Sequence, residues 1–176
     1  SILENAEQSI YNIRQGRESN GPAKVSEVIV NDVYTKLAQI TGDDKEKYKG
    51  IPSGFGMLDK MLTGLNKGNL ILIGARPAMG KTSFALNLAQ NITMGARKKC
   101  IVFSLEMQKT ELAERLLSSQ AGVESQKLKT GELTDEEWVR LGNAAATYND
   151  VELYLDDTSA ITVPEIKSRV RRMRGV

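Results

Sequence analysis

Residues 69–83 have the sequence NLILIGARPAMGKTS, in which a short apolar run passes directly into a loop of small residues that ends in lysine. The apolar run, 69–74, has the length and composition of a buried strand. The residues that follow the loop, 81–94, predict a helix, because apolar side chains recur at every fourth position from Phe84 and Gly95 is suited to end it. A strand, a loop and a helix in this order form the context of a phosphate-binding Walker A loop.

The loop contains the residue types that phosphate binding requires. Its backbone N–H groups can turn toward phosphate oxygens, and the start of the following helix adds a positive dipole. Gly80 lets the backbone approach the phosphates, Lys81 supplies positive charge to the β- and γ-phosphates, and Thr82 is placed to ligate Mg²⁺. Ala75 stands where the strict pattern has glycine, but alanine is small enough for the turn. The predicted nucleotide-binding residues are Ala75, Arg76, Pro77, Ala78, Met79, Gly80, Lys81, Thr82 and Ser83.

Nucleotide hydrolysis also requires a carboxylate that orients or activates the attacking water. Glu106 follows a second predicted buried strand, 100–104, by two residues. Because parallel strands present their C-terminal ends at the sheet edge where phosphate loops lie, Glu106 is a candidate catalytic residue together with Lys81. The alternative is that Glu106 only stabilises the N-terminus of a helix predicted over 110–121. Residue type and spacing favour neither interpretation over the other.

A second carboxylate, on a Walker B strand, would help to hold Mg²⁺. The run 151–155 ends at Asp156, but its residues alternate between apolar and polar, as in an edge or half-exposed strand. Asp156 and Asp157 also precede Thr158 and Ser159, which are typical of a loop before a helix. The sequence therefore favours a loop acid over a metal ligand at Asp156.

Strands and helices alternate along the rest of this region. Capping boxes at Thr134 and Thr162 mark the starts of two further helices. Strands over 69–74, 100–104 and 151–155 between helices predict an α/β fold with a parallel sheet flanked by helices.

Two helices are predicted before this globular region. The first covers 2–15, and the second covers 26–40 between two polar, linker-like segments. Ile29, Val33 and Leu37 lie on the apolar stripe of the second helix, which must be buried against either the chain's own core or a neighbouring subunit. The linkers on both sides favour the subunit interface.

Composition excludes several kinds of catalytic site. The 176 residues include no histidine and one cysteine, Cys100, so a Ser-His-Asp relay, a histidine-ligated zinc and an internal disulfide are impossible within this chain. The single cysteine favours a reducing compartment, and we expect a cytoplasmic protein. The longest apolar run, 70–73, is too short to span a membrane, and no signal peptide is recognisable.

Positive charge is concentrated at the C-terminal end. Residues 163–176 contain five basic residues and one acidic residue, whereas residues 1–162 contain 19 basic and 21 acidic residues. Lys167, Arg171 and Arg174 can share one helix face. A solvated face is favoured over a DNA site there, because no aromatic residues interleave with the cations to stack on bases.

Residues 64–85, which contain the loop, and the segment Phe103-Ser104-Leu105-Glu106-Met107 together resemble the RecA-type motor domain of bacterial replicative DNA helicases, the DnaB family. Residues 51–55 and 156–158 are similar to that family too. The combination of ARPAMGKTS with SLEM is specific, since another RecA-like ATPase would share the loop but not both segments. The resemblance implies three regions: the last helix of an N-terminal helical domain (1–16), a linker containing the helix 26–40 (17–50) and the N-terminal part of a RecA-like P-loop ATPase domain (51–176).

The resemblance also implies a function. It implies a homo-hexamer that uses ATP and Mg²⁺ to translocate on single-stranded DNA and to unwind duplex at the replication fork, with a primase and a helicase loader as partners and no membrane. It assigns Lys81 and Thr82 to the phosphates and Mg²⁺, Glu106 to water activation, and the helix 26–40 to packing on the adjacent protomer. It places the Walker B strand, the DNA-binding loops and the arginine finger after Val176, so Asp156 loses the metal role.

We therefore expect an incomplete RecA-like fold that binds nucleotide weakly but neither hydrolyses ATP nor unwinds DNA by itself. Two alternatives are another RecA-like ATPase, such as a recombinase or clock-type protein, and a non-catalytic assembly fragment. The SLEM segment and the linker helix argue against the first of these.

Overall fold

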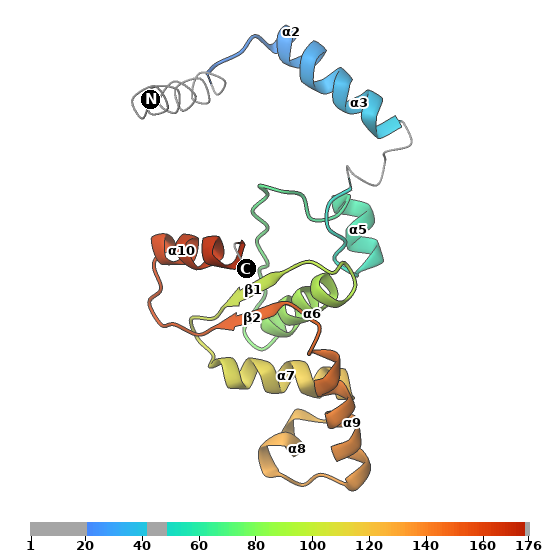
Figure 1. Cartoon of the computed structure of the whole chain (residues 1–176), viewed down its shortest axis with the longest axis vertical. Coiled ribbons are helices and arrows are strands. Elements are labelled where there is room, and N and C mark those ends of the chain that lie inside the picture. Colours follow the sequence, from blue (N-terminus) through green and yellow to red (C-terminus); the bar gives the residue numbers. More distant parts are fainter. Residues whose placement is uncertain (1–20, 42–48, 175–176) are drawn as a thin grey trace, which may run out of the picture. The chain divides into compact units, whose positions relative to one another are not determined.

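The computed structural model describes residues 21–41 and 49–174, which belong to two separate units divided after Tyr48 (Figure 1). The first unit contains one helical stretch made of α2 (Val25–Val28), a π-helical turn (Ile29–Val33) and α3 (Tyr34–Thr41). The helix predicted over 26–40 is thereby confirmed. The helix predicted over 2–15 lies outside the described residues, and the domain limits at 16 and 50 stay predictions.

The second unit is organised around a pair of parallel strands. β1 (Cys100–Phe103) and β2 (Leu153–Asp156) pair in a register that sets Cys100 opposite Leu153 and Phe103 opposite Asp156. The chain between the two strands consists of helices, which is the crossover that parallel strands require (Figure 1). The strands predicted over 100–104 and 151–155 are confirmed with different limits. β1 ends one residue earlier than predicted, and β2 begins two residues later and ends one residue later.

The prediction of a strand over 69–74 is wrong. This segment has no strand assignment, and its leucines, Leu70 and Leu72, are each 87% exposed. Strand structure needs a hydrogen-bonded neighbour, and within 21–41 and 49–174 no strand pairs with this segment. Apolar character alone therefore does not make this segment a strand.

One core cluster joins the sheet to two helices, α6 (Lys81–Met94) and α7 (Lys109–Ala121). Its buried members are Leu86, Leu112 and Leu116, and side chains of both strands pack against them. Both helices were predicted with nearly these limits. The stripe predicted for α6, which begins at Phe84, is only half-buried, because Phe84 stacks on Phe55 with ring centroids 5.0 Å apart while another face of the helix meets the core.

A second cluster lies between α7 and α9 (Asp135–Thr147), with the short α8 (Ser125–Thr130) beside it. Its buried members are Ala121, Val123, Leu141 and Ala144. The capping box at Thr134 is confirmed, since the Thr134 hydroxyl accepts from the backbone N–H of Glu137 and the Glu137 carboxylate accepts from that of Thr134. This cluster holds the crossover between the two strands in place.

The unit also contains α5 (Gly56–Leu62), which like α8 is a short helix that the sequence patterns did not predict. α10 (Val163–Arg174) begins where the second capping box was predicted, but there the Glu165 carboxylate accepts from both the backbone N–H and the hydroxyl of Thr162. No helix within the described residues is both long enough and apolar enough to cross a bilayer.

Candidate nucleotide-binding site

The predicted phosphate loop is an exposed, tightly turned segment at the start of α6. The backbone N–H of Met79 donates to the carbonyl of Arg76 at 3.2 Å, and Gly80 is the residue from which the helix begins. Two loop residues adopt left-handed backbone angles, Ala78 at φ 62° and Gly80 at φ 83°. Glycine reaches this region without cost, whereas alanine does so at a cost of about 1 kcal/mol, and such strain is concentrated at functional sites.

The loop residues and Glu106 meet in one pocket of about 530 Å³. Every predicted nucleotide-binding residue lines it, from Ala75 to Ser83, so the segment expected from the sequence forms a continuous wall. Glu106 lies on the turn between β1 and α7 and forms part of the same lining. The turn after β1 and the loop before α6 therefore bring the candidate catalytic carboxylate and the phosphate loop to the same pocket.

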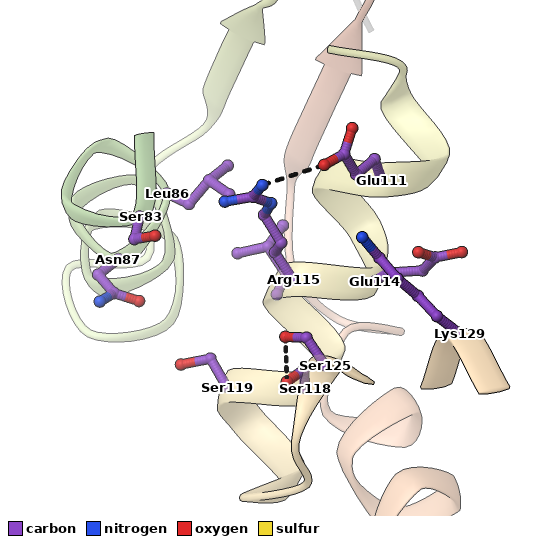
Figure 2. Close-up of a pocket in the computed structure, with 11 residues that line it drawn as sticks. Ser83, Leu86, Asn87, Glu111, Glu114, Arg115, Ser118, Ser119, Ser125 and Lys129 are labelled. Atoms are coloured by element: carbon purple, nitrogen blue, oxygen red, sulfur yellow. Dashed lines mark hydrogen bonds and ion pairs between the residues drawn. The ribbon is translucent and has the colours of Figure 1, made fainter. Parts of the chain in front are cut away.

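Arg115 is a further lining residue that the sequence analysis did not single out. It lies on α7, where its guanidinium donates to the Glu111 carboxylate at 3.0 Å (Figure 2). Arg115 and Ser83 also line an adjoining pocket of about 400 Å³ between α6 and α7. The sequence gives no signal for Arg115, which follows Glu106 by nine residues, because an arginine on a helix is most often solvated.

The lining carries more positive than negative charge. The lining contains one acidic residue, Glu106, and three cations, Arg76, Lys81 and Arg115, of which Arg115 is paired with Glu111 outside the lining. A polyphosphate suits this balance, and the helix N-terminus with its free N–H groups adds to it. Thr82, in the first turn of α6, supplies a hydroxyl in the same lining that is suited to Mg²⁺.

Asp156 has a structural partner instead of a place in this lining. Its carboxylate accepts hydrogen bonds from Arg169 of α10 and from the backbone N–H and hydroxyl of Thr158. These donors, Arg169 foremost, lower the pKa of Asp156 from 3.8 to about 2. The sequence expectation of a loop acid is corrected in one respect, because Asp156 is the last residue of β2, paired with Phe103, and its carboxylate ties α10 to the end of this strand. The described residues contain no cluster of three or more acidic or cysteine side chains suited to a metal.

The predicted interface residues lie in the first unit. Ile29, Val33 and Leu37 are 42%, 43% and 51% exposed, respectively. Val25, Val30 and Tyr34 on the same helical stretch are more exposed still. The stripe is therefore not buried by the residues described in its own unit.

Comparison with known proteins shows the family to which the chain is related. The model of the DnaB-like helicase C terminal domain matches residues 50–175. The replicative DNA helicase DnaB of Geobacillus stearothermophilus is 35% identical over 98% of this chain, and the replicative DNA helicase DnaC of Bacillus subtilis (strain 168) is 36% identical over 98%. The chain spans 38% of the length of each of these relatives.

Two solved structures have the same fold. The first, described as an ATPase domain, superimposes with a TM-score of 0.73 at 31% identity, covering 88% of this chain and 53% of that one. A DnaB-like replicative helicase, described with its interactions with primase, superimposes with a TM-score of 0.76 at 29% identity, covering 98% and 44%. The two parallel strands, their helices and the loop therefore form part of a RecA-like P-loop ATPase fold. The chain belongs to the DnaB-like helicase C-terminal domain family.

Proposed function

We propose that this chain contributes the phosphate-binding part of the motor domain of a hexameric replicative DNA helicase, which hydrolyses ATP to move along single-stranded DNA and unwind the replication fork. The observation that carries the proposal is the shared pocket, in which the phosphate loop and Glu106 line one cavity. Family membership and relatives named as replicative helicases support the same activity. Of the SLEM segment, Glu106 lines the pocket, and the sequence of this segment argues against a recombinase.

The residues of the pocket divide the chemistry among them. The backbone N–H groups at the start of α6 and the Lys81 ammonium bind the β- and γ-phosphates, and Gly80 leaves the approach free of a side chain. The Thr82 hydroxyl would help to hold Mg²⁺, which would supply positive charge to neutralise the phosphates. Glu106 accepts a hydrogen bond from the attacking water and orients it toward the γ-phosphate.

The exposed stripe of the first unit supports assembly into a ring. Ile29, Val33 and Leu37 present an apolar surface that a neighbouring subunit of the same chain would cover. Static light scattering on Leu37→Asp should show fewer oligomers, whereas Lys36→Asp on the same helix, an exposed polar position, should leave assembly unchanged. Equal loss in both variants would contradict the assignment.

Further partners follow from the family and not from the pocket. Single-stranded DNA, a primase and a helicase loader are the expected partners of the intact protein, and one structural relative is described with a primase. Cations on α10, such as Lys167 and Arg171, are exposed but stay a solvated face in this proposal.

The decisive experiment uses the full-length protein that carries these residues. Glu106→Gln should retain ATP binding but lose hydrolysis and unwinding of forked DNA by about 100-fold or more, because water orientation is lost while the phosphate loop stays intact. Glu114→Gln, an exposed acid on α7 outside the pocket, is the matched control. Full hydrolysis by Glu106→Gln, or pairing of duplexes in place of unwinding, would contradict the proposed function.

A further inference from the structure

Glu106 lies on a short turn that belongs neither to β1 nor to α7. Two side chains hold this turn at its ends. The Ser104 hydroxyl accepts from the backbone N–H of Met107 at 3.0 Å. The Asp157 carboxylate accepts from the backbone N–H of Lys109, the first residue of α7, also at 3.0 Å. Glu106 therefore lies between two fixed points.

The register of the strands places Asp157 where it can make this contact. Phe103 pairs with Asp156, and the backbone N–H of Ser104 donates to the carbonyl of Asp156 at 2.8 Å. Asp157 is consequently the first residue after the end of β2. Its hydrogen bond to the start of α7 therefore joins two residues that are 48 positions apart in sequence.

The two adjacent aspartates serve different elements. The Asp156 carboxylate accepts hydrogen bonds from Arg169 and Thr158 and so anchors α10. The Asp157 carboxylate points to α7, with the Lys109 ammonium 3.8 Å away as an additional, largely exposed partner. A carboxylate at a helix N-terminus satisfies a free N–H and interacts favourably with the helix dipole.

We propose that Asp157 is a positioning residue for Glu106: by fixing the start of α7 it holds the turn 104–109, and with it the Glu106 carboxylate, at the phosphate-loop pocket. Asp157 does not line the pocket and acts only through the turn. The inference rests on the proposed role of Glu106. Without the Asp157 oxygen, the first turn of α7 frays and Glu106 moves away from the phosphate loop.

The first test measures, in this chain, how well the start of α7 is protected from hydrogen exchange. Hydrogen exchange at the amide of Lys109 should be about tenfold faster in Asp157→Ala, which corresponds to one lost charge-assisted hydrogen bond. Asp157→Asn keeps an acceptor oxygen and should restore most of the protection. Asp150→Ala removes the same charge from an exposed position and should exchange as the parent chain does.

The second test measures the effect at the pocket, as the ratio of affinities for Mg-AMPPNP and Mg-ADP. A carboxylate near the γ-phosphate repels it, so Glu106→Gln should favour the triphosphate by about threefold. Asp157→Ala should change the ratio in the same direction, because the carboxylate leaves the pocket. The double variant should do no more than either single one, since the two act through the same group.

The outcomes distinguish a failure of the positioning role of Asp157 from a failure of the proposed role of Glu106. An unchanged ratio in Asp157→Ala, additive effects in the double variant, or an Asp157→Asn variant that behaves like Asp157→Ala would overturn the positioning role. If Glu106→Gln leaves the ratio unchanged while Asp157→Ala still accelerates exchange, the role of Glu106 in the proposed function fails. The positioning role then falls with it, although the turn is anchored as described.

Discussion

The phosphate loop and Glu106 reach the same pocket from segments that are packed very differently. Residues 69–81 are exposed throughout, whereas Glu106 follows a strand that pairs with β2 and lies in contact with the core under α7. The loop is shaped by its own backbone, through the left-handed angles at Ala78 and Gly80. Glu106 is placed by tertiary contacts. A substitution can therefore disturb the phosphate loop without disturbing the turn that carries Glu106, or the reverse. The following variants distinguish the two cases.

The largest difference is expected in stability. Leu112 on α7 is 1% exposed, and Leu112→Ala should lower the free energy of unfolding by about 3 kcal/mol, because it removes buried contacts and leaves a cavity. Leu72→Ala, at a leucine that is 87% exposed, should cost about 0.5 kcal/mol or less. Urea unfolding followed by circular dichroism measures both. Comparable losses would mean that the segment 69–74 is packed in solution.

The next effect concerns the loop itself. Gly80→Ala should weaken Mg-ADP binding about fivefold, because a Cβ meets no neighbouring atom there but must adopt φ +83°, a strain of about 1 kcal/mol. Gly74→Ala is the matched control, since this glycine has neither a positive φ nor a neighbouring atom within 4 Å. Titration calorimetry distinguishes the two. Equal affinities of both variants would contradict a backbone-determined loop.

A smaller effect is expected on the α7 side of the pocket. Arg115→Met should weaken Mg-ADP binding about threefold, since it removes one cation from a partly solvated lining but keeps the aliphatic length. Lys129→Met, which lines only the adjoining pocket, should bind as the parent chain does. An equal effect of the two variants would show that only overall charge matters.

The last prediction concerns pH. The pKa of Asp156 is lowered from 3.8 to about 2 by Arg169 and Thr158, so the unfolded chain takes up this proton at a higher pH than the folded one. Stability from this group is therefore complete above pH 4 and is lost as the pH falls toward 2. The unfolding midpoint of Asp156→Asn should vary less between pH 4 and pH 2 than that of the parent chain. An identical pH dependence of the two would contradict the pairing with Arg169.

The same contrast explains what could be predicted from sequence. Helices α6, α7 and α9 and the cap at Thr134 follow from local spacing and hydrogen bonding, and all were predicted. The segment 69–74 was predicted as a strand because it is apolar, but strand structure depends on a partner that local sequence does not specify. The short helices α5 and α8 lack a long apolar period and were missed.

The candidate site shows the same limits. The loop and Glu106 were found because their residue types and positions relative to the strands have a chemical reason. Arg115 and Asp157 become relevant to the site only when the chain folds. Arg115 lines the pocket from α7, and Asp157, which directly follows β2, contacts the start of α7 although the two are 48 residues apart in sequence. No spacing pattern encodes contacts of that kind.

The most direct test of nucleotide binding at this pocket is calorimetric titration of the chain with Mg-ADP, comparing Lys81→Ala with Lys67→Ala. Both lysines are exposed, but only Lys81 lines the pocket. We expect the parent chain and Lys67→Ala to bind with the same affinity, and Lys81→Ala to bind at least about 30-fold more weakly because the phosphates lose a charge-assisted hydrogen bond. Absence of binding by the parent chain, or equal binding by the two variants, would contradict the assignment of the phosphate loop.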